Sequence, residues 1–312
     1  MLDVRRLQVL SEIDRCGSFS GAALALGMSQ PAVSQHVAAL EQAVDVPLVE
    51  RGTRPVGLTE AGHALVRHAR GVLARLDAAE HELAELAGRR NARLRLGGFP
   101  TALATLVPGA LTAYRRARPD VALSVVGDHM QRLLPRLHGG ELDIALVYDD
   151  PANPATHPAG FTTIPLFDDP FTAVLPPEHP LVGRRALTLR DLAEETWIGG
   201  TPTSTWFHIV RRACHAAGVE PRVRFSTDDY VAIQALVAAD LGVAVVPSLA
   251  VGPTAHRVHA RALPHPTPIR RISVALPPDG HRHSAVQTMI DVLRRGGRNR
   301  RIDAASAPDF DR

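Results

Sequence analysis

The spacing of apolar residues predicts three short helices at the start of the chain. A first helix follows from the apolar positions between Leu2 and Ile13. Ser18 can cap a second helix, and Gly27 can end it because glycine adopts the left-handed conformation at little cost. Ser29 can cap a third helix, whose apolar residues predict one buried row of Val33, Val37, Leu40 and Val44. The second and third helices, joined by a tight turn, predict a helix-turn-helix.

The opposite face of the third predicted helix carries short polar or small side chains. Gln30, Ser34, Gln35 and Ala38 lie there, and Pro31 occupies the first turn, where a missing N–H costs nothing. Glutamine reads adenine with two hydrogen bonds and serine bonds to either base, so this face suits base edges in a DNA groove. Two short helices joined by a glycine turn also occur without a DNA-binding role, and the pattern alone leaves that alternative open.

Residues 46–58 contain two short apolar runs around a turn of Gly, Thr and Pro, which predicts a hairpin or wing. Arg51 and Arg54 lie near its tip. A wing that carries arginine beside a recognition helix is placed to contact phosphates or the minor groove. A solvated surface loop is the alternative.

A long helix is predicted from Thr59, which can cap it, to about Leu86. Its apolar positions alternate in spacing between four and three, as in the seam of a coiled coil, and they are Leu65, Ala69, Val72, Leu76, Ala79, Leu83 and Leu86. Charged residues flank this seam, so only the apolar row of the helix needs to be covered by a packing partner. That partner is either a second copy of the chain or another part of the same chain. Residues 88–91, Gly-Arg-Arg-Asn, indicate a hinge into a separate domain.

From Arg93 onward the pattern changes to strands that alternate with helices. Apolar runs at 121–126 and 144–147 flank a helical pattern around 131–137, which is a βαβ order. The proline-rich residues 149–158 are interpreted as a crossing segment, after which the alternation repeats as far as residue 246. Ile272–Leu276 and the final helical pattern predict a return to the first lobe. Two crossings would then join two α/β lobes.

Composition excludes several classes of enzyme. The 312 residues are 45% hydrophobic with a formal net charge of +3, and since the chain has no lysine, all 35 basic residues are arginine. Pyridoxal-phosphate Schiff bases and the phosphate-binding P-loop both require a lysine. No Gly-x-Ser-x-Gly, His-Glu-x-x-His, paired-cysteine zinc spacing or Rossmann glycine fingerprint occurs. We therefore expect no catalytic residue, no metal and no cofactor.

Cysteine usage and the apolar runs bear on the protein's compartment. Cys16 and Cys214 lie far apart, without metal or redox spacing, which indicates small buried residues, with a redox role as the alternative. Residues 1–20 show no signal-peptide pattern, and the apolar run 243–246 is too short to cross a bilayer. We expect a cytoplasmic protein with no membrane partner.

The first 90 residues resemble the LysR-type transcriptional regulators. The motifs that carry this resemblance, in the family's order and spacing, are Ser18-Phe-Ser-Gly-Ala-Ala, Met28-Ser-Gln-Pro-Ala-Val-Ser, Leu40-Glu41, Pro47-Leu48, Glu50-Arg51 and Leu58-Thr-Glu-Ala-Gly62. Three positions depart from the family: Gln35 stands where arginine is common, Asp45 where glycine is usual, and Val49 where phenylalanine is usual. The two predicted lobes are similar to the family's effector domain, which resembles type 2 periplasmic binding proteins.

The resemblance implies the fold class and the order of domains. We expect an α/β chain with an all-α-dominated N-terminal winged helix-turn-helix (1–58), a linker dimerisation helix and hinge (59–91), and a two-lobed effector-binding domain (92–295). Lobe I would comprise 92–160 and 268–295, and lobe II 161–267. The polar residues 296–312 would form a disordered tail.

Two sets of site residues follow for the N-terminal part. The residues expected at the DNA are Ser18, Ser29, Gln30, Pro31, Ser34, Gln35, His36, Arg51 and Arg54. The residues expected at the dimer contact are Leu65, Val72, Leu76, Leu83 and Leu86.

A ligand site is expected where helices begin at the carboxyl ends of strands, because free N–H groups are presented there. Phe99-Pro100-Thr101 and Thr203-Ser204-Thr205 occupy two such places, and the resemblance implies that both face an interlobe cleft that would hold a small carboxylate. Serine and threonine also cap helices where no ligand binds, which is the alternative at each position. The full expected set is Phe99, Pro100, Thr101, Tyr148, Thr203, Ser204, Thr205, Trp206, Val246 and Pro247.

The sequence therefore predicts a LysR-type regulator that binds double-stranded operator DNA and a small-molecule effector, without enzymatic activity. The family resemblance implies a dimer that pairs into a tetramer, and contact with RNA polymerase if the protein is an activator. The alternative is a solute-binding domain, or an enzyme that processes a small acid, with an accessory helical N-terminus.

Overall fold

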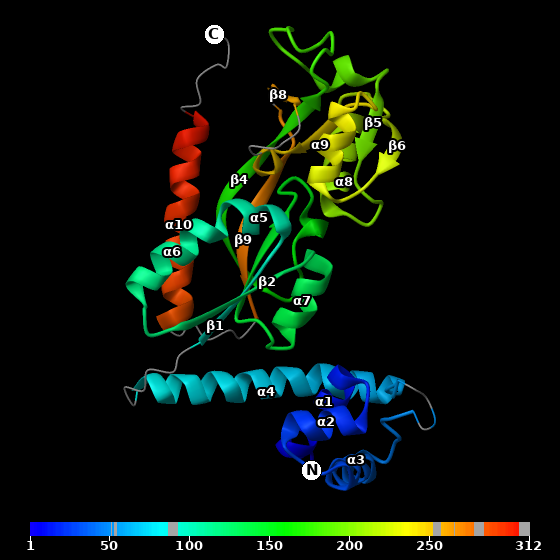
Figure 1. Ribbon diagram of the computed structural model, residues 1–312, viewed down its shortest axis with the longest axis vertical. Coiled ribbons are helices and arrows are strands. Elements are labelled where there is room, and N and C mark those ends of the chain that lie inside the picture. Colours follow the sequence, from blue (N-terminus) through cyan, green and yellow to red (C-terminus); the bar gives the residue numbers. More distant parts are fainter. Residues whose placement is uncertain are drawn as a thin grey trace.

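The computed structural model describes residues 1–50, 52, 55–86, 93–251, 257–264, 266–277 and 284–305. A small helical unit and one long helix lie at one end of the molecule, and a two-lobed α/β body lies at the other (Figure 1). The predicted fold class, a winged helix-turn-helix followed by a two-lobed α/β domain, is confirmed. No helix within the described ranges combines the length and the apolar character needed to span a membrane.

The N-terminal unit begins with three helices, α1 (Val4–Cys16), α2 (Phe19–Leu26) and α3 (Gln30–Val44). The predicted caps are confirmed, because the Ser18 hydroxyl accepts from the Gly21 N–H at 3.0 Å and Ser29 accepts from Ala32 at 3.4 Å. Gly27 ends α2 with a φ of 61°. Asp45 ends α3 with a φ of 56°, so a non-glycine residue adopts the left-handed conformation there.

These helices share one core with the start of α4 (Glu60–Leu86). An isolated bridge between Val49 and Leu58 forms the base of the wing. The Thr59 hydroxyl accepts from the Gly62 N–H at 3.1 Å and so caps α4 as predicted. Val66 and Ala69 of α4 are buried against the helical unit, which fixes the first turns of α4 to it.

Seven strands form one mixed sheet that passes through both lobes, in the order β2-β1-β3-β9-β4-β7, with β8 also paired to β4. In lobe I, β1 pairs in parallel with β2 and β3, and β9 runs antiparallel between β3 and β4. The lobe I strands and shared strands are β1 (Arg93–Gly98), β2 (Ala122–Gly127), β3 (Ile144–Asp149), β4 (Thr162–Leu175) and β9 (Ile269–Leu276). The helices of lobe I are α5 (Pro100–Thr105), α6 (Val107–Ala117), α7 (Met130–His138) and α10 (Ser284–Ala305).

Lobe II is built around the second half of β4. The strands β7 (Ala244–Pro247) and β8 (His259–Ala262) pair with that half, and β5 (Thr196–Gly199) pairs in parallel with β6 (Arg222–Ser226). The helices α8 (Thr205–Ala216) and α9 (Tyr230–Ala238) complete its core, which includes Trp197 and Trp206.

The lobes are joined differently from the sequence-based prediction. Residues 149–158 were expected to cross between the lobes, but they contain the end of β3 and a short 3₁₀ turn, and the crossing lies inside β4 and β9. Phe167 of β4 belongs to the lobe I core and Phe171 to the lobe II core, so the chain changes lobe about ten residues later than predicted. The polar run Asp168-Asp169-Pro170 interrupts the apolar pattern of β4 and conceals that it is one strand.

The C-terminal helix also differs from prediction. α10 continues to Ala305, so residues 296–305 are helical rather than part of a disordered tail. Gly297 allows close packing here, because a Cβ at that position would lie 2.8 Å from the Phe167 ring. The remaining residues of the expected tail, 306–312, lie outside the described ranges.

Candidate functional site

The exposed face of α3 carries the residues predicted to read DNA. Gln30, Ser34 and Gln35 are exposed on this face, and His36 is half-buried beside them. Gln30 accepts a hydrogen bond from the Ser20 hydroxyl at 3.3 Å, which ties the start of α3 to α2. Ser18, Ser29 and Pro31 shape the helix starts. Arg51 and Arg54 lie outside the described residues.

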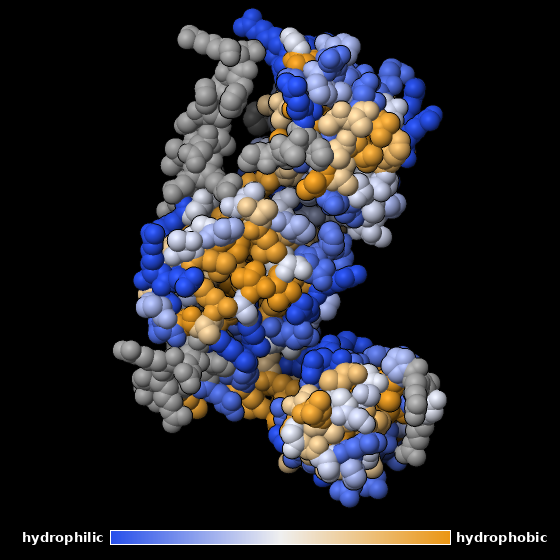
Figure 2. Space-filling model, in the orientation of Figure 1, coloured by the Kyte–Doolittle hydropathy of each residue, from blue (hydrophilic) through white to orange (hydrophobic). Residues whose placement is uncertain are grey.

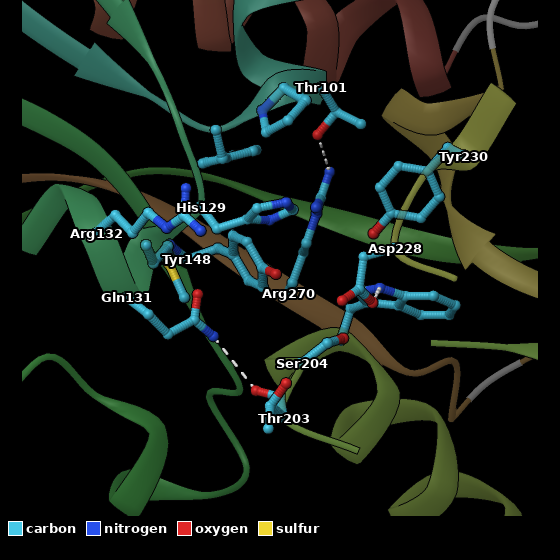
Figure 3. A pocket seen from close by; sticks show the side chains of 14 residues that line it. Thr101, His129, Gln131, Arg132, Tyr148, Thr203, Ser204, Asp228, Tyr230 and Arg270 are labelled. Atoms are coloured by element: carbon cyan, nitrogen blue, oxygen red, sulfur yellow. Dashed lines mark hydrogen bonds between the residues drawn. The ribbon is translucent and has the colours of Figure 1, made fainter. Parts of the chain in front are cut away.

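A cavity of about 240 Å³ lies where the two lobes meet. Figure 3 shows side chains of lobe I on one side of it, side chains of lobe II on the other, and Arg270 between them. Its volume is below the range of about 300–1,000 Å³ found for sites that hold drug-sized ligands, so it suits a smaller molecule. The described lining residues are Phe99, Pro100, Thr101, His129, Met130, Gln131, Arg132, Tyr148, Thr203, Ser204, Trp206, Asp228, Tyr230 and Arg270.

Arg270 is buried at the base of this cavity, with 1% of its surface exposed. Its guanidinium lies 2.9 Å from the carboxylate of Asp169, its cross-strand neighbour, and donates to the Thr101 hydroxyl at 2.8 Å. Its guanidinium carbon lies 5.1 Å from the Phe99 ring centroid and 4.9 Å from that of Tyr148. Arg270 therefore links both crossing strands to the first helix of lobe I, and the two rings hold it in place.

Asp228 is the charged residue of the lobe II wall. Its Oδ1 accepts from the Thr201 N–H at 3.0 Å and from the Trp206 indole at 3.2 Å, and its Oδ2 accepts from the Thr201 hydroxyl at 2.6 Å. The rings of Trp206 and Tyr230 pack beside it, with centroids 5.4 Å apart. Burial raises the pKa of Tyr230 well above its ordinary value, so its phenol stays protonated at neutral pH.

One hydrogen bond spans the mouth of the cavity. The Gln131 side-chain amide of α7 donates to the Thr203 carbonyl of lobe II at 3.3 Å (Figure 3). The Ser204 hydroxyl accepts from the Phe207 N–H at 3.3 Å and so caps α8. Residues of both lobes thus meet at this point.

Seven of the ten predicted effector residues line the cavity: Phe99, Pro100, Thr101, Tyr148, Thr203, Ser204 and Trp206. Three do not. Thr205 begins α8 outside the lining, Val246 is fully buried in the lobe II core, and Pro247 pairs with Phe171 in the sheet. The end of β7 packs against β4 rather than opening into the cavity, because β4 continues through both lobes.

Sequence reasoning missed half of the lining: His129, Met130, Gln131, Arg132, Asp228, Tyr230 and Arg270. His129 and Asp228 precede helices that follow parallel strands, so the helix-start rule could have found them. Arg270 gives no comparable signal, because it lies within a strand and its role depends on pairing with β4.

The apolar seam of α4 is divided between two environments. Leu65 is partly buried and packs against the helical unit, which leaves less of its side chain free for the predicted dimer contact. Val72, Leu76 and Leu83 are exposed by 44%, 43% and 65%. The side chain of Leu86 lies outside the described residues, as does the predicted hinge 88–91.

The two cysteines are both free and lie too far apart in the structure to form a disulfide with each other. Cys16 lies in α1 and Cys214 in α8, at opposite ends of the molecule (Figure 1). Burial raises the pKa of the Cys214 thiol to about 12, so the reactive thiolate is scarce at neutral pH. The described residues contain no group of three or more His, Cys, Asp and Glu that could hold a metal ion.

Comparison with known proteins gives the same division of the chain. Residues 4–63 match the family described as "Bacterial regulatory helix-turn-helix protein, lysR family", and residues 87–298 match the "LysR substrate binding domain". A probable hydrogen peroxide-inducible genes activator of Mycobacterium avium is 37% identical over 82% of each chain. Its counterpart in Streptomyces viridosporus is 34% identical over 90% of each chain. A full-length OxyR variant of Pseudomonas aeruginosa matches with a TM-score of 0.78 at 25% identity, over 94% of this chain and 95% of that one.

Proposed function

This chain belongs to the LysR family of bacterial transcriptional regulators, and from that membership we propose how its parts divide the work. Residues 1–58 bind operator DNA, α4 joins two copies, and residues 92–295 bind a small-molecule effector between the lobes. The exposed polar face of α3 is the observation that carries DNA binding. Bacterial operator DNA lies in the cytoplasm, so the protein acts there.

Base reading by Gln35 can be tested by substitution. Gln35→Ala is expected to relax base preference at one position of the operator at a cost of about 1–3 kcal/mol, because a bidentate contact is lost. Binding to random DNA should stay unchanged. Gln8→Ala, on α1, is the matched control and should alter neither. Gel shifts on specific and random DNA across a salt series give the measurement.

The competing classes predict different results in the same assay. A solute-binding domain or a small-acid enzyme would show no salt-dependent shift of operator DNA, whereas phosphate contacts make affinity fall steeply with salt. Equal loss on specific and random DNA for Gln35→Ala would contradict base reading by this residue.

The effector site is proposed to be the interlobe cavity, where an anionic group such as a carboxylate binds toward lobe I. Thr101, His129 and Arg132 lie on that side, and lobe II supplies Thr203 and Ser204. A ligand shifts an equilibrium between open and closed lobes only through its differential affinity for the two states, and contacts from both lobes supply that difference.

Non-covalent binding is favoured here over oxidation of cysteine pairs. The Mycobacterium avium and Streptomyces viridosporus relatives bear names that refer to hydrogen peroxide. In this chain the only two cysteines lie in different domains and Cys214 is buried, which supports a reversible ligand as the signal.

Self-association is supported by two surfaces. The exposed row Val72, Leu76 and Leu83 gives α4 an apolar line with no cover in the described chain. The second surface is β2, which is an edge strand in the part of the chain that the structure describes and exposes Val125. An edge strand can pair with a strand of another copy. Figure 2 shows apolar atoms gathered on this face of lobe I, over the region of α5, α6 and β2. Two different surfaces are compatible with dimers that pair into tetramers. If the protein is an activator, we propose that it also contacts RNA polymerase.

We propose that the chain performs no catalysis. Asp149, His157 and Thr163 do form a hydrogen-bonded series, with 2.6 Å from the carboxylate to the imidazole and 3.1 Å from the imidazole to the hydroxyl. Thr163 is paired within the sheet to Ala275, and neither it nor His157 lines the interlobe cavity. A turnover assay that detected chemistry on a bound small acid would contradict this proposal.

A further inference from the structure

The two walls of the interlobe cavity differ in charge. Among its described lining residues, the lobe I side carries His129 and Arg132, and Arg270 lies at the base. Asp228, on the lobe II side, is the one carboxylate among them. A molecule that spans the cavity therefore meets the guanidinium of Arg132, which also lies 3.9 Å from Asp128, at one end and the carboxylate of Asp228 at the other.

The charges of Arg270 and Asp228 are balanced in different ways. Asp169 pairs with Arg270 at 2.9 Å and both side chains are buried, so this charge is matched within the protein. The three hydrogen bonds to Asp228 come from a backbone amide, a hydroxyl and an indole, all of them neutral. No arginine or histidine of the described chain forms an ion pair with Asp228. Its negative charge faces the cavity without a cationic partner.

Aromatic rings surround the same position. Trp206 donates its indole N–H to Asp228, and the Tyr230 ring packs against Trp206. Figure 3 shows the Tyr230 hydroxyl pointing toward Asp228 across the lobe II side of the cavity. The Tyr230 hydroxyl and the Asp228 carboxylate both offer hydrogen-bond acceptors to an ammonium group here, and the bond to the carboxylate is the stronger one because both groups are charged.

We propose that the effector carries a cationic amino group that binds Asp228 against Trp206 and Tyr230, and a carboxylate that points to lobe I. The ligand is thus a small zwitterion of the amino acid class. This inference rests on the proposed function, which places the effector in this cavity. An ammonium group matches the charge of Asp228, whereas a second carboxylate at that place would bring like charges together. The zwitterion bridges the lobes because its two charges have their partners on opposite sides.

The test uses the full chain and matched probes. The common L-amino acids are screened by thermal shift, and each one that binds is compared by calorimetry with its deaminated acid and its decarboxylated amine. For phenylalanine these are 3-phenylpropionate and phenethylamine. We expect at least one amino acid to bind, and both truncated analogues to bind at least about tenfold more weakly.

Asp228→Asn is the decisive variant, because it removes the charge and keeps the shape. It is expected to weaken amino acid binding by at least about tenfold and to leave the affinity for the deaminated acid unchanged. Asp229→Asn is the matched control. Asp229 caps α9 through the N–H groups of Val231 and Ala232 and does not line the cavity, so this change should not alter ligand affinity. Thermal unfolding without ligand confirms that both variants are folded.

Three outcomes would overturn the inference. Equal binding of amino acid and deaminated acid, with Asp228→Asn without effect, would show an anion site and would leave the proposed function standing. Failure of every amine-bearing probe to bind would reject the zwitterion class. Binding that survives Thr203→Trp, which fills the mouth of the cavity, would place the ligand elsewhere and so reject the proposed effector site as well.

Discussion

Two neighbouring arginines on β9 occupy opposite environments. Arg270 and its partner Asp169 are almost fully buried, whereas Arg271 and Asp168 are partly exposed, although both pairs join the same two strands. Side-chain alternation along a strand explains the difference, because successive residues point to opposite faces. The two arginine–aspartate pairs therefore have the same charges and join the same two strands, and they differ in how deeply they are buried.

Arg270→Met is predicted to lower the free energy of unfolding by about 3–5 kcal/mol, because it removes the guanidinium from a buried ion pair with Asp169. Arg271→Met should cost about 0–1 kcal/mol, as is usual for exposed pairs. Urea unfolding of both variants, followed by circular dichroism, measures the difference. Similar losses for the two variants would show that the buried pair contributes no more than the exposed one.

At the residue scale, the sequence predicted the helix caps and much of the cavity but not its charges. Ser18, Ser29 and Thr59 cap helices by rules that need only local sequence. Thr101 and Ser204 were found because helix starts recur at the ends of strands. Arg270 depends on the pairing of strands about a hundred residues apart in sequence, and no local pattern carries that information.

At the element scale, α4 has one covered end and one exposed row. Val66 and Ala69 are buried against the helical unit, while Val72, Leu76 and Leu83 are exposed. The heptad spacing predicted one continuous seam, and the structure divides it because the helical unit covers the first turns. The dimer contact is therefore proposed for the second half of α4.

Leu76→Glu combined with Leu83→Glu is predicted to convert the dimer into a monomer, because like charges would face each other along the seam. Multi-angle light scattering measures the mass in solution. His63→Glu with Arg67→Glu, at exposed positions of the first turns, is the matched control and should leave the mass unchanged. An unchanged mass for the leucine variant would assign self-association to another surface such as β2.

Elements were predicted well where the apolar pattern is continuous and poorly where polar residues interrupt it. The strands at β3 and β9 follow from apolar runs that agree with their buried residues. The sequence did not predict β4 as one strand, because Asp168, Asp169 and Pro170 interrupt its apolar pattern and its first half pairs with the distant strand β9. α10 was ended too early because its last residues are polar and glycine-containing, although glycine there permits close packing.

At the scale of the whole molecule, the DNA-binding unit and lobe I meet across α4. Arg70 of α4 pairs with Asp14 of α1 at 2.7 Å, and the same side chain lies against Gly139, where a Cβ would be 3.0 Å from its Cδ. At Gly140 a Cβ would lie only 1.9 Å from that of Ala74. The turn between α7 and β3 thus touches the helix that carries the DNA-binding unit. Asp77 adds ion pairs to Arg93 and Arg95 of β1.

Gly140→Ala is predicted to move lobe I relative to α4 and so to change operator affinity without effector by at least about fivefold, the lower end of coupling between sites. Gly160→Ala is the matched control. Both glycines have a positive φ, 71° and 78°, but a Cβ at Gly160 would meet no atom within 4 Å. Footprinting of both variants measures the effect, and equal affinities would show that this contact transmits no signal.

The position of Asp228 has a consequence for how such a regulator diversifies. Asp228 lies in the short connection between β6 and α9, whereas Arg270 and Asp169 lie on the strands that hold the lobes together. If Asp228 binds the effector as proposed, mutation at residue 228 is expected to alter ligand choice while the strands that join the lobes and the DNA-binding unit stay intact. New specificities would then arise in evolution through few substitutions. The same separation makes this connection the natural place to randomise when the protein is engineered as a biosensor.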